Sequence, residues 1–301
     1  MKRARPIILL IPFLFLFLKC SPQKKDALLK AGEFKKGKRL AELKEKKLVE
    51  VSGLASSVNN PGMMWTVNDS GNDPEVFLID LETNIKQKYT LEGIENRDWE
   101  DVAVGPGPDP TKSYVYVAEI GDNMAIHGYK HIYRFEEPVV GAAKEKDIAI
   151  TKFETITFSL ADSKRDTEAL LIDRKTKDLY IISKWSDPVY IYRIPYPYST
   201  SDTTVAAQIG SLAYSKIVAG DISKDGRDIL LKNYSHIYLW HRDGTKSIVE
   251  TLQSKPQEIP YETEPQGESI TWAQDNSGFY TLSEIKKGQK TYLYFYERKE
   301  E

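Results

Sequence analysis

Five stretches of this chain repeat one pattern, and that repeat constrains the fold more than any other feature of the sequence. Each unit opens with a short apolar segment, passes through a turn rich in Asn, Asp, Gly, Pro or Lys, and returns in a second apolar segment. Such turn residues supply the backbone conformations of tight turns, so each unit predicts a β-hairpin. The five units begin at Ser52-Gly-Leu-Ala, Glu100-Asp-Val-Ala, Glu168-Ala-Leu-Leu, Gly220-Asp-Ile-Ser and Glu268-Ser-Ile-Thr.

Each unit continues with a third, aromatic strand, and most with a fourth that is more weakly marked. Helical periodicity is almost absent after residue 47, and turn signals recur at strand spacing, so the pattern predicts an all-β fold. The second strands are predicted at 64–68, 115–119, 179–183, 229–233 and 279–283, and the third at 76–79, 131–135, 189–193, 236–240 and 292–296. Fourth strands are predicted, for example, at 153–158 and 247–252.

The spacing of the units favours a closed ring. Successive units start 48, 68, 52 and 48 residues apart, a pitch typical of four-stranded propeller blades with an insertion in the second one. The last unit has only about 33 residues and lacks a fourth strand, which residues 47–51 could supply. We therefore expect a five-bladed β-propeller of antiparallel four-stranded sheets over 47–301, closed by an N-terminal strand. Six blades are the alternative.

The N-terminus predicts export. A basic start, Met1-Lys-Arg-Ala-Arg, precedes an apolar run over 7–18, and Cys20 follows. Twelve helical residues would reach roughly 18 Å, short of the ~30 Å hydrocarbon core, so 1–20 is interpreted as a signal sequence. Cys20 resembles the lipidated cysteine of bacterial lipoproteins, although Lys19 stands where a small residue is usual. A plain secretory signal or an uncleaved anchor is the alternative.

Residues 21–46 are polar and Lys-rich, and are interpreted as a tether with a partly helical end around 40–48. Cys20 is the only cysteine, so no disulfide can form within the chain. A net charge of −2 and the absence of a basic stripe argue against nucleic-acid binding. We expect a monomer outside the cytoplasm, in the periplasm or at the cell surface, attached to a membrane through Cys20.

One column of the repeat predicts a metal site. If the first strand of each blade lines a central tunnel, its leading side chains converge on the axis. Gathered carboxylates repel one another, and a bound cation removes that cost. Calcium takes six to eight oxygen ligands, whereas the four scattered histidines disfavour zinc. The column residues are Ser52, Glu100, Glu168, Gly220 and Glu268. The alternative is that these glutamates form salt bridges with Arg97 and Arg165.

The ends of the second strands form another candidate cluster. A ring of acids and amides with one lysine could bind a polyol, a peptide, or a phosphate through a second cation. Asp69 and Glu119 are the candidates for general acid or base catalysis, because crowding can tune a carboxylate toward neutral pH. Equally, Asn and Asp are what any tight loop needs. The ligand-binding candidates are Asn68, Asp69, Glu119, Asp122, Asn123, Lys184, Asn233 and Glu284.

Two resemblances bear on these expectations. The Ser, Glu, Glu, small residue, Glu column with a long second unit resembles the calcium-activated nucleotidases (apyrases), which implies an axial calcium ion. Those enzymes carry an acidic pair followed by arginine on the second strand of the first blade, whereas this chain has Asn68-Asp-Ser-Gly-Asn-Asp. The chain also resembles a group of secreted bacterial propeller proteins, often without an assigned activity, in phrases such as Trp99-Glu-Asp-Val-Ala-Val-Gly-Pro and Gln266-Gly-Glu-Ser-Ile.

Two functions remain open from the sequence. The first, which we favour, is a lipid-anchored platform that is braced by calcium and binds a ligand or partner on the face carrying Asp69 and Glu119. The second is a metal-dependent hydrolase of phosphate esters or anhydrides, or of a small ester or lactone. The missing arginine favours the platform, and the metal column favours the hydrolase.

Overall fold

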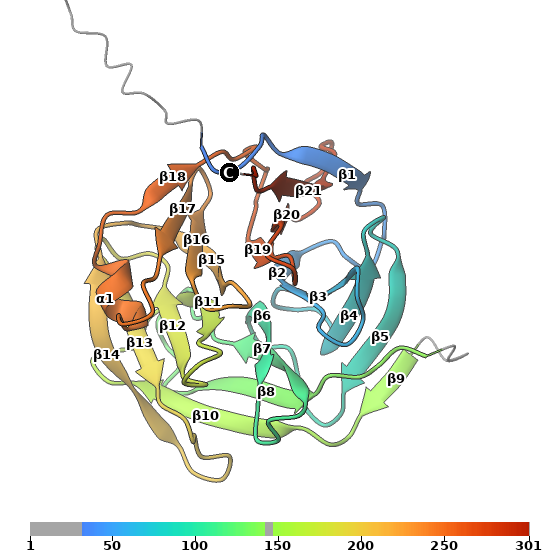
Figure 1. Ribbon diagram of the computed structural model, residues 1–301. Helices are drawn as coiled ribbons and strands as arrows, with labels where there is room; N and C mark the ends of the chain where they lie inside the picture. The colour runs from blue at the N-terminus through green and yellow to red at the C-terminus, as the bar shows by residue number, and fades with distance from the viewer. Residues whose placement is uncertain (1–31, 142–146, 301) are drawn as a thin grey trace, which may run out of the picture. The chain divides into compact units, whose positions relative to one another are not determined.

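The described part of the chain is almost entirely β-structure (Figure 1). The computed structural model describes residues 32–141 and 147–300, which form 21 strands and one short helix. The predicted signal sequence, Cys20 and the first part of the predicted tether lie outside these residues. No helix within the described ranges is long and apolar enough to cross a membrane.

The first three strands of every predicted unit pair in chain order, each antiparallel to the next. The sequence-predicted second and third strands agree with the observed ones to within one or two residues at each end. The first strands are β2 (Val51–Ser56), β6 (Trp99–Pro106), β11 (Thr167–Ile172), β15 (Ile217–Ile222) and β19 (Ser269–Trp272). The second are β3 (Met63–Asn68), β7 (Ser113–Glu119), β12 (Leu179–Ser183), β16 (Asp228–Asn233) and β20 (Gly278–Leu282). The third are β4 (Glu75–Asp80), β8 (Lys130–Glu136), β13 (Val189–Ile194), β17 (Ile237–His241) and β21 (Tyr292–Glu297).

Four of the units add an outer fourth strand. These strands are β5 (Ile85–Leu91), β10 (Glu154–Leu160), β14 (Thr204–Leu212) and β18 (Gln257–Ile259). Parallel pairing joins β10 to β14 at the periphery, so the second and third units share one eight-stranded sheet. A short extra strand, β9 (Asp147–Ile150), pairs in parallel with β5.

The strand predicted over 247–252 is wrong, because this segment forms helix α1 (Ile248–Leu252). Ser247 caps the helix by accepting a hydrogen bond from the backbone of Glu250, whose side chain accepts from the Ser247 backbone in return. This Ser-x-x-Glu capping box is a helix-start signal that outweighs the β-branched composition of the segment.

The outer strand of the last unit comes from the N-terminal side of the domain. Strand β1 (Lys38–Glu42) pairs antiparallel with β21, which gives the sheet order β1-β21-β20-β19. The closing strand therefore lies at 38–42, inside the segment interpreted as a tether, and not at 47–51 as predicted. Leu43 and Leu48 are buried beside it, so the chain is already part of the core here.

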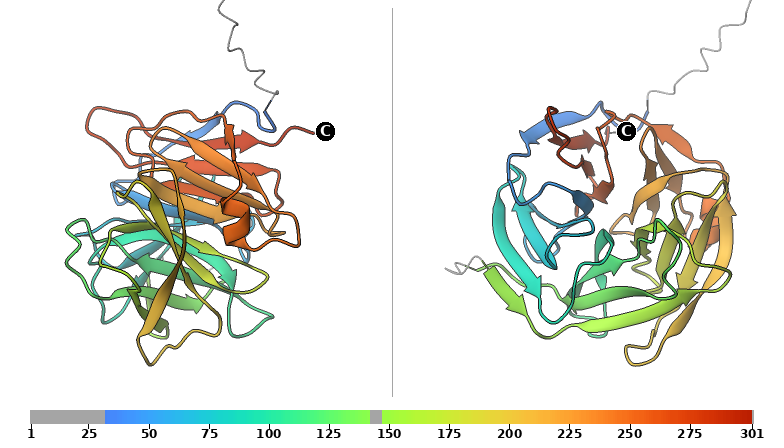
Figure 2. Two further views of the ribbon diagram at one scale, coloured as in Figure 1. Left: turned by 90° about the vertical axis from the view of Figure 1, so that its left-hand side faces the viewer. Right: turned by 180° about the vertical axis from the view of Figure 1, so that it is seen from behind.

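The five first strands touch one another in a closed cycle: β2 contacts β6, β6 contacts β11, β11 contacts β15, β15 contacts β19, and β19 contacts β2. They lie nearest the centre of the view in Figure 1, and the outer strands lie at its periphery. Figure 2 shows the same strands edge-on and from behind. Five separate apolar clusters fill the spaces between neighbouring groups of strands. Inter-sheet packing of aromatic and branched side chains thus holds the domain together.

Buried aspartates tie neighbouring inner strands together. The Asp101 carboxylate, on β6, accepts hydrogen bonds at 2.8 Å from the backbone amides of Val102 and Leu170, the second of which lies on β11. Asp221, on β15, accepts in the same way from the amide of Trp272 on β19, at 2.9 Å. Each carboxylate satisfies an amide that no strand pairing reaches, which matters because an unpaired buried N–H is costly.

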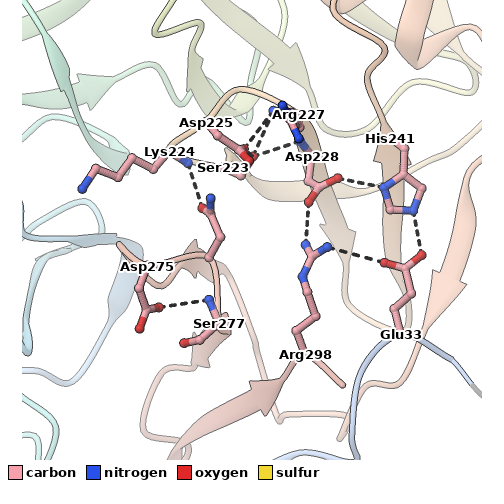
Figure 3. Close-up of polar contacts among 11 residues, drawn as sticks. Glu33, Ser223, Lys224, Asp225, Arg227, Asp228, His241, Asp275, Ser277 and Arg298 are labelled. Carbon is pink, nitrogen blue, oxygen red and sulfur yellow. Dashed lines mark hydrogen bonds and ion pairs between the residues drawn. The ribbon is translucent and has the colours of Figure 1, made fainter. Parts of the chain in front are cut away.

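A polar cluster fastens the N-terminal segment to the sheet edge (Figure 3). His241, at the end of β17, lies 2.7 Å from both Asp228 and Glu33 through its two ring nitrogens. Arg298 bridges the same two carboxylates from the C-terminal side. The hydrogen bond to Asp228, then the negative charge of Glu33, raises the pKa of His241 to about 9. Phe34, next to Glu33, is buried against Trp272 and Phe279.

Candidate cation site

A β-bulge at the start of the inner strands positions the key carboxylates. The pairing register of β6 with β7 shifts at Glu100, and that of β11 with β12 shifts at Glu168. A bulge leaves one residue unpaired and re-aims its side chain. The equivalent bulge residues are Gly53 on β2 and Val218 on β15. Glu268 precedes β19 at the same place in the register.

Two aspartates that the sequence prediction missed complete the cluster. Oxygens of Glu100, Asp166 and Glu168 lie within 4.8 Å of one another, as do oxygens of Asp69, Asp98 and Glu100. Glu100 belongs to both groups, so five carboxylates form one continuous acidic cluster. The sequence signal for them is the repeated Asp-x-Glu of Asp98-Trp-Glu100 and Asp166-Thr-Glu168.

Glu100, Asp166 and Glu168 are buried, Asp69 and Asp98 are partly exposed, and the cluster is short of hydrogen-bond donors. Glu168 is fully buried, and neither of its carboxylate oxygens accepts a well-directed hydrogen bond from the described residues. Asp166 is 6% exposed, with one oxygen bound to the Asp122 amide at 2.8 Å and the other without a partner. A side chain at Gly121 would collide with Asp98 and Glu100, so glycine leaves room for them.

Burial and mutual repulsion shift the acidity of the cluster upward. Burial, followed by the charges of Glu168 and Asp69, raises the pKa of Glu100 well above its ordinary range. Burial, with the charges of Asp69 and Asp166, raises the pKa of Asp98 to about 6. Burial also raises the pKa of Glu168. These carboxylates are therefore hard to ionise together unless a positive charge joins them.

Lys184 supplies one such charge within the protein. Its Nζ lies 2.6 Å from Glu168 Oε1 and 3.5 Å from Glu268 Oε1. Burial lowers the pKa of Lys184, but the charges of Glu168 and Glu268 outweigh burial and raise it overall. Glu268 also accepts a hydrogen bond from the Tyr234 hydroxyl. Glu168 and Glu268 therefore form ion pairs with Lys184, a residue that the sequence prediction did not consider as their partner.

The two predicted arginines have other partners. Arg97 lies 3.5 Å from Glu119, and Arg165 lies 2.8 Å from Asp162. Neither is paired with the column glutamates, so the idea that they neutralise Glu100 or Glu168 is wrong.

The remaining two column residues are placed differently. The Ser52 hydroxyl donates to the backbone carbonyl of Glu100 at 2.5 Å, and so links β2 to β6. Gly220 packs against Leu231 and Leu171, because the β15 bulge falls two residues before it. Of the five predicted ligands, Glu100 and Glu168 lie in the acidic cluster and Glu268 adjoins it through Lys184.

Four of the eight predicted second-strand candidates are held by hydrogen bonds within the protein. Asn68 bonds the backbone of Lys47 and Glu50, and Asp122 accepts from the amides of Ile126 and His127. Asn233 accepts from the amides of Ser235 and His236. Glu119 accepts from the Tyr133 hydroxyl at 3.2 Å.

The other four candidates are Asp69, Asn123, Lys184 and Glu284, of which Lys184 and Glu284 are buried. Asp69 is a member of the acidic cluster, and burial raises its pKa. Glu284 accepts from Gln266 at 2.8 Å and pairs with Lys286, while burial raises its pKa to about 7. Asn123 is exposed and accepts from the indole of Trp185.

No protein-family model matches this chain, and no curated protein shows significant sequence similarity to it. The function is therefore inferred from the chemistry of its own residues. Hard carboxylate oxygens gathered in a buried cluster fit a hard cation such as Ca²⁺ or Mg²⁺.

Proposed function

We propose that this protein is an exported five-bladed β-propeller that binds a divalent cation in the cluster of Asp69, Asp98, Glu100, Asp166 and Glu168, and uses that face as a ligand-binding platform. The five inner strands in cyclic contact support the blade count. The proposal for the cation rests on the buried Asp166 oxygen that has no partner and on the gathering of five carboxylates, for which Lys184 supplies only one positive charge.

Calcium is the cation that this set of ligands favours. Ca²⁺ accepts six to eight oxygens in flexible geometry, whereas Mg²⁺ demands a near-octahedral set and keeps several waters. Carboxylates from three separate segments of the chain suit the more adaptable ion. Lys184 neutralises one side of the cluster, and the calcium ion would neutralise the side formed by Asp98, Glu100 and Asp166.

Calorimetric titration of the metal-free, full-length protein with calcium chloride tests this proposal. We expect one binding event and a rise in melting temperature, because a ligand that binds only the folded state stabilises it. Glu168→Gln and Asp166→Asn should abolish both effects. Glu258→Gln, which alters an exposed carboxylate on β18, is the matched control and should behave like the wild type. Absence of calcium binding in the wild type would refute the proposal.

Export and lipid attachment rest on the sequence of residues 1–20. We propose that Cys20 is lipidated, which places the protein on an extracytoplasmic membrane surface. Metabolic labelling with a fatty acid that carries an alkyne should mark the wild type but not Cys20→Ser. Labelling of neither protein would leave a plain secretory signal or an uncleaved anchor as the explanation.

Hydrolysis is the second candidate, because carboxylates gathered in one cluster could hold a metal ion that activates a water molecule. With Asp98 among its ligands, such an ion would lower the pKa of its bound water and so supply the nucleophile. Assays with ATP, ADP, a simple phosphate ester and a lactone, each with calcium and with chelator, test it. Calcium-dependent turnover that Asp98→Asn removes would support the hydrolase. Calcium binding without turnover of any of these substrates would support the platform.

A further inference from the structure

A pocket of about 490 Å³ opens beside the acidic cluster. It lies between the loop that follows β7 and the end of β12, and Asn123, Asp166, Trp185 and Ser186 are among its lining residues. Asp166 belongs to both the pocket and the cation cluster, so a molecule in the pocket would lie next to a bound cation.

Trp185 is the feature that points to a ligand. Trp185 is 53% exposed, which is unusual for the largest apolar side chain. It is nevertheless held in place, because its indole N–H donates to Asn123 Oδ1 at 3.2 Å and the ammonium groups of Lys184 and Lys216 lie 5.2 and 5.8 Å from the ring centroid. An exposed aromatic ring with fixed orientation is a preorganised stacking surface.

The polar groups of the pocket suit hydroxyl donors. Asp166 lines the pocket and is 6% exposed, and one of its buried oxygens has no hydrogen-bond partner, which is costly. The two cationic residues that line the pocket, Lys164 and Arg165, already have partners. Lys164 donates to the Ile126 carbonyl at 2.7 Å, and Arg165 pairs with Asp162 and stacks on Tyr190. An anionic ligand would therefore find few free donors here.

We propose that this pocket binds a ring of a neutral saccharide. The C–H face of a pyranose would stack on Trp185, and its hydroxyls would donate to Asp166 and exchange hydrogen bonds with Asn123 and Ser186. Neighbouring hydroxyls of the same ring could also complete the coordination of the cation. This inference rests on the proposed function, since it names the ligand class of the platform.

Calorimetric titration of the full-length protein, in a detergent without a sugar headgroup, tests the inference. The probes are maltohexaose, cellohexaose, xylohexaose and N-acetylchitohexaose, each with calcium present. At least one should bind. Trp185→Ala should weaken that binding at least about tenfold, the equivalent of losing roughly 1.4 kcal/mol of contact, and Trp185→Phe should weaken it less. Val139→Ala, which alters an exposed apolar residue elsewhere, is the control and should change nothing.

The two proposals fail in different ways. Trp185→Ala should leave calcium binding intact, whereas Asp166→Asn should weaken both calcium and saccharide binding. Calcium binding with no binding of any of the four oligosaccharides would overturn the saccharide site alone. Equal saccharide affinity in the wild type and Trp185→Ala would do the same.

Discussion

The ammonium group of Lys184 lies 2.6 Å from a carboxylate oxygen of Glu168, and both side chains are almost completely buried. A buried charge pair of this kind is costly to break from either side, because the remaining charge has no solvent to stabilise it. The same lysine limits how much positive charge a metal can add. Lys184 therefore sets both the stability of the metal-free protein and its affinity for a cation.

Lys184→Met should affect these two properties in opposite directions. In chelator, the free energy of unfolding should fall by about 3 kcal/mol, since Glu168 and Glu268 lose their buried counter-charge. Calcium affinity should rise, because one competing positive charge is gone. Urea denaturation and calorimetric titration measure the two effects. Lys216→Met is the control, because Lys216 also approaches Trp185 but is exposed and pairs with neither glutamate. Weaker calcium binding by Lys184→Met would contradict this prediction.

Gly53→Ala should be far more damaging than Gly62→Ala. Both glycines have positive φ, 76° and 77°, so both substitutions carry the left-handed backbone cost of roughly 1–2 kcal/mol. A Cβ at Gly53 would lie 2.5 Å from the Val102 backbone nitrogen, whereas nothing lies within 4 Å of one at Gly62. The difference in urea midpoint between the two variants isolates the close approach of β2 to β6. Equal midpoints would show that β2 can move away.

The His241 contacts predict a pH dependence of stability. The folded-state pKa of about 9 exceeds the ordinary 6.5, so this stabilisation is complete below pH 6.5 and is lost as pH rises through about 9. Melting temperature should therefore fall across that window, and the slope should be smaller for His241→Asn. His236→Asn, which changes a partly exposed histidine at the opposite end of β17, is the control. A slope unchanged in His241→Asn would exclude the Glu33, Asp228 and Arg298 cluster as its cause.

Asp101→Ala should destabilise the domain by about 3 kcal/mol, because it leaves the buried amides of Val102 and Leu170 without their acceptor. Asp109→Ala changes an aspartate in an exposed turn and should stay within about 0.5 kcal/mol of the wild type. Chemical denaturation compares the two. If Asp101→Ala were as stable as Asp109→Ala, β6 and β11 would be joined by packing alone.

The strand order could be predicted from the sequence because turns and apolar segments are local signals. Tight turns such as Asn59-Asn-Pro-Gly and Asp275-Asn-Ser-Gly predict hairpins, because their residues favour turn conformations. The antiparallel pairing of the first three strands in every unit followed from those turns. A local signal also explains why the strand predicted at 247–252 is wrong: the capping box of Ser247 and Glu250 starts a helix there.

The candidate site was harder to predict, because it depends on register. The bulge residues of the inner strands are Gly53, Glu100, Glu168 and Val218. Glu100 and Glu168 therefore occupy equivalent positions, whereas Ser52 and Gly220 lie one and two residues away from the equivalent position. No single-sequence signal announces a bulge at Val218. Lys184 pairs with Glu168 inside the third unit and approaches Glu268 of the fifth, and repeat alignment does not reveal the second contact.

Strand β1 joins the sheet that contains β19, β20 and β21, so residues near 40 hydrogen-bond with residues near 294. During synthesis on the ribosome, β1 must wait for almost the whole chain to emerge before its partner exists. A chain that stops before Tyr292 would consequently leave the edge of β1 unpaired. Proteolysis after Glu42 that released β1 would leave the edge of β21 unpaired in the same sheet.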